Sequence, residues 1–259
     1  MSLSGKHALV CGASDGIGRA TAFALAEKGA EITILARSEN KLESLLSQLE
    51  NAGASSAHFV AVDLEDSDAL KSAVSAHLSA VGHIQILVNN SGGPPAGPLL
   101  QASEEEFLKP LRRHLFAAHA LVGLLLPGMV ESNFGRIVNI ISTSVREPIA
   151  NLGVSNTVRG AMASWSKTLA TELPPMVSIN NVLPGFTDTG RLSSLAESIA
   201  AKEGITPDAV KQRWIGQVPA GRLAEPEETA ATIAFLCSEE AAYIRGSSIA
   251  VDGGRLRSI

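Results

Sequence analysis

Short hydrophobic runs alternate with longer stretches that are hydrophobic on one side only. The short runs predict strands at 7–11, 31–36, 57–63, 84–89, 136–142, 177–183 and 248–251. The longer stretches repeat with helical spacing and predict helices at about 16–28, 39–51, 67–81, 104–131, 153–173 and 227–238. Strands that alternate with helices form parallel sheets, because each helix returns the chain to the same edge. The pattern therefore predicts an α/β fold, a doubly wound parallel sheet of Rossmann type with about seven strands and helices on both faces.

The stretch 184–222 interrupts this alternation. Within it, the spacing predicts helices at 192–203 and 207–217. Irregular segments of this length in a compact domain usually cover a functional site. We therefore expect a single domain over residues 1–259, with a substrate lid at about 184–222.

Composition and charge narrow the possible partners. The chain has 259 residues, of which 45% are hydrophobic, enough for one large core. Its 21 basic and 26 acidic residues give a net charge of −5 with no basic stripe, so a nucleic-acid partner is not expected. Cys11 and Cys237 each lie alone in a hydrophobic run, which predicts buried thiols and no metal site. Without a secretory signal or a membrane-spanning run, we expect a cytoplasmic protein with no membrane partner.

The first predicted strand runs directly into a glycine-rich turn that opens a helix. Glycines at this point allow a tight turn and bring backbone N–H groups against a pyrophosphate at the helix N-terminus. Glycine-rich turns also serve ordinary strand-to-helix connections, so the inference depends on the position between strand and helix. The turn predicts a dinucleotide site that includes Gly12, Ser14, Asp15, Gly16, Ile17 and Gly18.

The residue that follows the second strand bears on the choice of cofactor. An acidic residue there accepts the ribose 2′-hydroxyl of NAD, whereas an arginine can hold the 2′-phosphate of NADP. Here the residue is Arg37, between Ala36 and Ser38. This favours NADP(H) over NAD(H); the alternative is that Arg37 is only a solvated surface charge.

The spacing Gly-x-x-x-Gly-x-Gly resembles that of the short-chain dehydrogenase/reductase family. Further motifs of the same resemblance are Val62-Asp63-Leu64, Asn89-Asn90-Ser91-Gly92, residues 181–185, residues 218–223 and residues 251–254. Within the family, these motifs resemble those of the 3-oxoacyl-(acyl-carrier-protein) reductases. The resemblance implies that the cofactor site also includes Asp63, Leu64, Asn89, Ser91, Gly92, Arg159, Pro184, Gly185, Thr187 and Thr189.

The family's chemistry is hydride transfer between a nicotinamide and a carbonyl or alcohol. A tyrosine acts as acid and base, a lysine four residues later lowers its pKa, a serine holds the substrate oxygen and an asparagine lies on a preceding helix. Ser142 stands at the serine position. Ser155 and Arg159 stand at the tyrosine and lysine positions, and His114 stands at the asparagine position. The single tyrosine of the chain, Tyr243, lies in another segment, so no phenol replaces the missing one.

These substitutions change what the catalytic positions can do. A serine hydroxyl is a far weaker acid than a phenol, so Ser155 does not simply replace tyrosine. Arg159 can hold a ribose hydroxyl, polarise a carbonyl or bind a carboxylate, or it can form a structural ion pair. His114 titrates near neutrality by residue type and is the candidate acid or base, or else an interior histidine. For Ser142, the alternative is a hydroxyl that caps the following loop.

The sequence therefore predicts an NADP(H)-dependent oxidoreductase, similar to 3-oxoacyl reductases, with an altered proton relay. The alternatives are a dinucleotide-binding protein without catalysis, such as a sensor, and a lyase or dehydratase that uses the fold without net redox change. The expected substrate is a small carbonyl or alcohol compound, with residues 91–95 as one wall of its site. The lid is expected to supply Phe186, Arg191, Leu192 and Trp214. The resemblance also implies a homo-oligomer, either a dimer or a tetramer, because members of the family commonly assemble through two long helices, and the helices expected here at 116–129 and 161–173 are apolar enough to pair.

Overall fold

The computed structural model describes residues 1–258, and its centre is one fully parallel sheet. Its strands are β1 (His7–Cys11), β2 (Glu31–Ala36), β3 (Ala57–Ala61), β4 (Ile86–Asn89), β5 (Gly135–Ile140), β6 (Val177–Pro184) and β7 (Ser248–Val251). They are arranged in the order β3-β2-β1-β4-β5-β6-β7. The direction of winding reverses between β1 and β4, which confirms the predicted doubly wound sheet.

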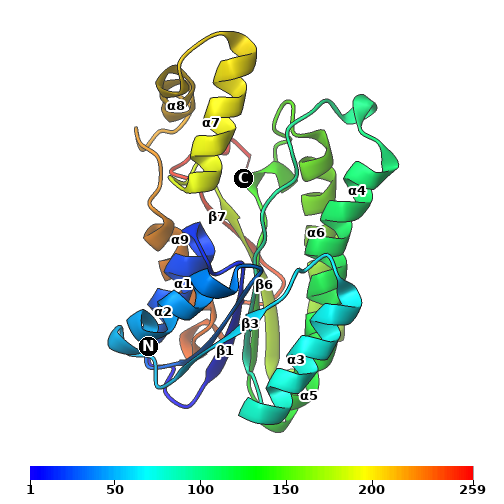
Figure 1. Cartoon of the computed structure of the whole chain (residues 1–259), viewed down its shortest axis with the longest axis vertical. Coiled ribbons are helices and arrows are strands. Elements are labelled where there is room, and N and C mark those ends of the chain that lie inside the picture. The colour runs from blue at the N-terminus through cyan, green and yellow to red at the C-terminus, as the bar shows by residue number, and fades with distance from the viewer. Residues whose placement is uncertain (259) are drawn as a thin grey trace.

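Helices cover both faces of the sheet (Figure 1). One face carries α1 (Gly16–Ala26), α2 (Glu39–Asn51) and α9 (Pro226–Leu236), and the other carries α3 (Ser67–Val81), α5 (Ala117–Glu131) and α6 (Gly153–Glu172). The helix α4 (Glu104–Leu111) packs on α6 and continues into α5 through the π-helical segment η2 (Arg112–Phe116). Short 3₁₀ turns are η1 (Leu99–Gln101), η3 (Thr143–Val145) and η4 (Glu239–Ala241). The sequence pattern predicted one continuous helix over 104–131 and did not predict the π-helical interruption.

The strand β3 ends two residues before its predicted end. It lies at the edge of the sheet and pairs only with β2, and the register places Ala36 opposite Ala61. Because β2 ends at Ala36, residues after Ala61 have no partner strand for a continued ladder.

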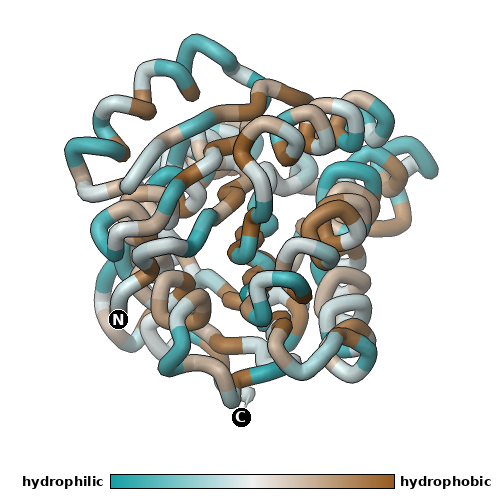
Figure 2. The backbone as a smooth tube through the Cα atoms, turned by 90° about the horizontal axis from the view of Figure 1, so that it is seen from below, coloured by the Kyte–Doolittle hydropathy of each residue, from teal (hydrophilic) through white to brown (hydrophobic). Residues whose placement is uncertain are grey.

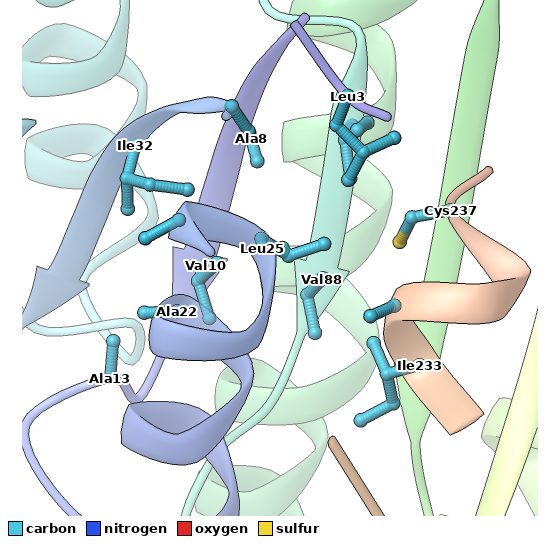
Figure 3. Packing of buried hydrophobic residues seen from close by; sticks show 14 of the residues in the cluster. Leu3, Ala8, Val10, Ala13, Ala22, Leu25, Ile32, Val88, Ile233 and Cys237 are labelled. Carbon is cyan, nitrogen blue, oxygen red and sulfur yellow. The ribbon is translucent and has the colours of Figure 1, made fainter. Parts of the chain in front are cut away.

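The core consists of two hydrophobic layers, one on each face of the sheet. Figure 3 shows the first layer, where Leu25 of α1 and Ile233 of α9 approach Val10 and Val88 of the central strands. Cys237 belongs to this layer, and both it and Cys11 are free and buried, as predicted. Burial raises the pKa of both thiols to about 12, so neither is a reactive thiolate at neutral pH.

The hydropathy of the backbone agrees with this layering. Figure 2 shows many hydrophobic segments near the centre and many of the hydrophilic segments towards the outside. Within the described residues, the continuous helical run Glu104–Glu131 is long and apolar enough to span a bilayer by length and composition. The core helix of a globular protein satisfies the same criterion, and Leu121, Leu125 and Met129 of this run are buried in the second layer.

Two further helices, α7 (Gly190–Glu203) and α8 (Pro207–Ile215), project beyond the carboxyl ends of the strands (Figure 1). They have a small core of their own. In this core the ring of Phe186 stacks on that of Trp214, with centroids 5.3 Å apart. Both rings, and Leu192 beside them, were expected to face the substrate, but they stabilise the helical pair instead.

At the opposite end of the sheet, three histidines surround the start of β1 and β2. The rings of His7, His58 and His77 have centroids 5.8 to 6.3 Å apart. Thr33 Oγ1 lies 2.7 Å from His7 Nε2 and 2.8 Å from His77 Nε2, and Glu31 Oε1 lies 3.0 Å from His58 Nε2. His7 is only 3% exposed, and this burial lowers its pKa to about 4, with Glu31 partly opposing the shift.

This depressed pKa predicts a loss of stability in mild acid. An unfolded histidine binds a proton near pH 6.5, whereas folded His7 binds one only near pH 4, so the unfolded state holds more protons between these values. When the pH is lowered from 7.5 to 5.0, the titration of His7 should reduce the free energy of unfolding by about 2 kcal/mol. Urea unfolding at the two pH values measures the change, and His7→Gln should reduce it. An equal pH dependence in wild type and variant would show that His7 does not cause it.

Candidate active site

A cavity of about 660 Å³ opens at the carboxyl ends of β1, β2, β4, β5 and β6. This is the edge at which the winding of the sheet reverses, where open α/β sheets bind their ligands. Segments far apart in the sequence meet here. The cavity is lined by these predicted site residues: Gly12, Ser14, Asp15, Gly16, Ile17, Arg37, Asp63, Leu64, Ser91, Gly92, Ser142, Ser155, Arg159, Pro184, Gly185 and Thr189.

The turn between β1 and α1 has little room for a side chain at its three glycine positions. Gly12 and Gly16 have φ angles of +60° and +54°, which L-residues with side chains rarely adopt. A Cβ on Gly18 would lie 2.2 Å from the carbonyl oxygen of Gly12, which also accepts a hydrogen bond from Asn90 Nδ2 at 3.2 Å. Asp15 caps α1 by accepting from Gly16 N at 2.8 Å. The turn is thus a cradle of backbone atoms at a helix N-terminus, which fits a pyrophosphate.

Two cations line the cavity at the end of β2. Arg37 is exposed, and its Nη1 lies 3.7 Å from Asp63 Oδ2. Lys41 lines the same end of the cavity from the first turn of α2. Lys41 was not identified from the sequence, although its place three residues after the N-cap residue Ser38 could have indicated it. Together the two cations fit a 2′-phosphate.

Three of the predicted cofactor residues lie behind the cavity wall. Asn89 begins a buried ladder, in which its Nδ2 donates to Asn139 Oδ1 at 2.8 Å and Asn139 Nδ2 donates to Asn181 Oδ1 at 3.0 Å. Thr187 is buried and pairs with Ala224 in an isolated bridge. Gly18 is buried in the first turn of α1. These residues position the wall and do not themselves border the cavity.

At the other end of the cavity lie Ser142, Ser155 and Arg159, which the sequence analysis proposed as catalytic residues. Ser142 follows β5, and its Oγ accepts from Ser144 N at 3.1 Å, so it caps η3 and still borders the cavity. Ser155 and Arg159 lie one turn apart on α6, which places them on the same helix face. Arg159 Nη1 donates to the carbonyl of Ile140 at 2.9 Å.

Arg159 is 8% exposed, and its Nε is buried without a hydrogen-bond partner among the described residues. Burial and the neighbouring charge of Arg191 lower the pKa of its guanidinium to about 10. The side chain therefore remains charged at neutral pH, and its charge is only weakly solvated.

His114 lies in the π-helical segment, beneath the cavity. Its Nδ1 is 2.5 Å from Ser91 Oγ, and only Ser91 of this pair borders the cavity. Burial is the main cause of a pKa well below the ordinary value, and the charges of Arg159 and Arg113 lower it further. His114 is therefore neutral at pH 7. The expectation that it titrates near neutrality is wrong, because the sequence did not reveal its burial beside two arginines.

Two arginines that line the cavity donate hydrogen bonds to backbone carbonyls of the segment after β4. Arg113 Nη1 donates to the carbonyl of Gly92 at 3.1 Å, and its guanidinium forms an ion pair with Glu65. Arg191, from the first turn of α7, donates through Nη2 to the carbonyl of Pro94 at 2.8 Å. Arg191 was expected in the lid, whereas Arg113 was not identified from the sequence. Arg113 lines the cavity from the π-helical segment, which the hydrophobic pattern does not predict.

Comparisons with known proteins agree with this architecture. A family model described as enoyl-(acyl carrier protein) reductase matches residues 12–255. The 3-oxoacyl-(acyl-carrier-protein) reductase FabG of Vibrio cholerae is 34% identical over 257 residues, which are 98% of each chain. The NADPH-dependent reductase BacG of Bacillus subtilis is 30% identical, over 99% of this chain and 100% of its own. L-sorbose reductase of Gluconobacter frateurii, solved with NADPH and L-sorbose, superposes with a TM-score of 0.94 at 32% identity, over 100% of this chain and 99% of its own.

Proposed function

This chain belongs to the short-chain dehydrogenase/reductase family, and we propose that it is an NADP(H)-dependent oxidoreductase acting on a small carbonyl or alcohol compound, similar to 3-oxoacyl reductases. One observation carries the proposal. A single cavity joins a phosphate cradle flanked by Arg37 and Lys41 to a cluster of Ser142, Ser155 and Arg159. The first part fits the cofactor, and the second provides polar groups for a reacting oxygen.

When bound, NADPH supplies the hydride. The residues of this chain have other tasks in the proposal. Ser142 Oγ already accepts from Ser144 N, so its own proton is free to donate to the substrate oxygen. Arg159 stabilises the negative charge that develops on that oxygen. A water molecule held by Ser155 supplies the proton, because the serine itself is too weak an acid.

His114 has a positioning role in this proposal. As a neutral imidazole 2.5 Å from Ser91 Oγ, it orients the Ser91 hydroxyl at the cavity wall. It does not gain or lose a proton in the working pH range, because burial keeps the charged form unfavourable.

The test of the activity is a panel of carbonyl compounds with NADPH, followed by the loss of cofactor absorbance. We expect turnover of at least one compound. Binding of NADPH without turnover of any compound would instead support the non-catalytic alternative. Formation of product without a change in absorbance would support a lyase or dehydratase.

The cofactor preference is tested at Arg37. We expect NADPH to bind more tightly than NADH in fluorescence titrations, and Arg37→Asp to weaken NADPH by at least about 10-fold, because an attraction to the 2′-phosphate becomes a repulsion. Lys41→Gln should have a smaller effect in the same direction. Lys71→Asp on α3 makes the same charge change away from the cavity and serves as the control. Equal affinities for the two cofactors in wild type would remove the assignment.

We also propose a homo-oligomer, a dimer or tetramer, formed through the outer sides of α5 and α6. Two observations support this proposal. Only 39% of an apolar 18-residue stretch within Glu104–Glu131 is buried. The side chains of Phe116 and Val130 in the same run are 46% and 42% exposed. A Cβ on Gly123 of α5 would meet no atom within 4 Å, so Gly123→Glu adds a charge there without disturbing the fold. Light scattering should show an oligomer in wild type and smaller species in this variant. A wild-type monomer would contradict the proposal.

A further inference from the structure

Two guanidinium groups from different elements face the same point of the cavity wall. A Cβ built on Gly93 would lie 3.8 Å from Nη2 of Arg159 and 3.8 Å from Nη2 of Arg191. Arg159 reaches this point from α6 and Arg191 from the lid helix α7. The fold thus places two cations near Gly93, and both line the cavity.

Within the described residues, no carboxylate forms an ion pair with either group. Arg159 Nη1 and Arg191 Nη2 donate to backbone carbonyls, and Arg159 Nη2 forms no hydrogen bond with residues 1–258. Arg113, the third arginine at this end, differs from them because it is paired with Glu65.

The acidic residues that line the cavity are Asp15 and Asp63. Asp63 lies beside Arg37, and Asp15 caps α1. Asp15 Oδ2 approaches Gly190, at 3.2 Å from where a Cβ would stand, but it forms no ion pair with Arg191. The substrate end therefore carries an excess of positive charge.

Two neighbouring guanidinium charges, one of them buried, repel each other unless an anion binds between them. Arg159 is 8% exposed, and its lowered pKa reflects both this burial and the charge of Arg191. A bound anion would relieve the repulsion and use the free donors. The fork of a guanidinium matches the two oxygens of a carboxylate better than it matches a neutral carbonyl.

We propose that Arg159 and Arg191 bind a carboxylate of the substrate, so that the substrate is an oxo acid and the product a hydroxy acid. The inference rests on the proposed function. Ser155 lies one helical turn before Arg159, and Ser142 borders the same end of the cavity, so the carboxylate is held beside the reacting carbonyl. The hydride adds to the carbonyl carbon and a proton from water adds to its oxygen, while NADPH is oxidised to NADP⁺.

The cofactor is the other possible source of an anion. Its pyrophosphate has a cradle of its own in the glycine turn, and its 2′-phosphate has Arg37 and Lys41. Neither phosphate needs the guanidinium pair at Gly93. The experiment must still separate the two sources, because Arg191 follows Thr189 and Gly190, which lie close to the N-terminus of α1.

The first arm compares acids with their methyl esters. The probes are 2-oxobutanoate, 3-oxobutanoate and 4-oxopentanoate, which vary the distance between carbonyl and carboxylate. For at least one pair, kcat/KM should be about 10- to 100-fold higher for the acid, and Arg191→Gln should lower the acid-to-ester ratio by a similar factor. Arg112→Gln is the matched control, because Arg112 belongs to η2, pairs with Glu105 and does not line the cavity.

Two results would overturn the inference. One is that every ester is used as well as its acid. The other is that Arg191→Gln weakens NADPH binding and lowers turnover of acid and ester equally, which would assign the guanidinium pair to a cofactor phosphate.

The second arm measures binding without turnover. Calorimetry with the NADPH-saturated protein should show binding of the preferred acid and weaker binding in Arg191→Gln. Such binding in a protein that reduces no carbonyl compound would leave this inference standing and remove the proposed reaction. Turnover of esters without binding of any acid would leave the proposed reaction standing and overturn the carboxylate site. Absence of turnover and of acid binding would overturn the two proposals together.

Discussion

Replacing Ser155 by tyrosine together with Arg159 by lysine is expected to raise the reduction of simple neutral ketones by about 10²-fold or more. A positioned general acid contributes about 10²–10⁴-fold, and a phenol with a pKa near 10 can act as one where a serine hydroxyl cannot. The two positions are one turn apart on α6 and both line the cavity beside Ser142. The lysine would place an ammonium next to the phenol and favour its ionised form.

Initial rates of NADPH oxidation with cyclohexanone measure this gain. The single change Ser155→Tyr is the control and should gain less, because the guanidinium of Arg159 keeps its bond to Ile140. The placement of the catalytic residues would be wrong if wild type already reduced such ketones rapidly and lost nothing on single replacement of His114, Ser142 and Arg159 by alanine. Circular dichroism is needed for the His114 variant, because that side chain is buried.

Replacing Gly18 by alanine is expected to weaken NADPH binding by at least about 100-fold, because the added methyl group has no space. Its Cβ would lie 2.2 Å from the Gly12 carbonyl oxygen and 2.6 Å from Asn90 Nδ2. The Asn90 amide donates a hydrogen bond to the Gly12 carbonyl, so neither group can move without opening the turn that binds the pyrophosphate. A loss of this size corresponds to about 3 kcal/mol of binding free energy.

Fluorescence titration with NADPH measures the effect, and circular dichroism tests whether the domain remains folded. Gly160→Ala is the matched control, since a Cβ at that position of α6 meets no atom within 4 Å. Undiminished affinity in Gly18→Ala would show that the phosphates bind elsewhere.

Much of the fold was determined by local pattern. The alternation of strand and helix periods located every element of the sheet, and β1, β2 and β7 have the predicted bounds. The strands could be predicted because the spacing of hydrophobic residues and the residue types favoured in turns depend on only a few neighbouring residues. The glycine turn was identified for the same reason, since Gly12, Gly16 and Gly18 are close in the chain and the constraint on each is steric.

Other features depended on residues that approach from distant segments. The neutral state of His114 follows mainly from burial and from the charge of Arg159, which belongs to α6 and lies 45 residues later in the chain. Phe186 and Trp214 pack on each other, and this contact removes them from the substrate surface. A residue's type does not determine how much solvent or which charge surrounds it.

The sequence by itself thus determined the doubly wound sheet, the phosphate turn, and the presence of Ser155 and Arg159 where the family has tyrosine and lysine. Only the tertiary structure decided that Lys41 lines the cavity together with Arg37, and that Arg159 and Arg191 both approach Gly93 without an ion-paired carboxylate among residues 1–258. The physical reason is that backbone conformation is set by short-range sterics and period, whereas the charge and hydration of a site are summed over all groups that the fold brings within a few ångströms.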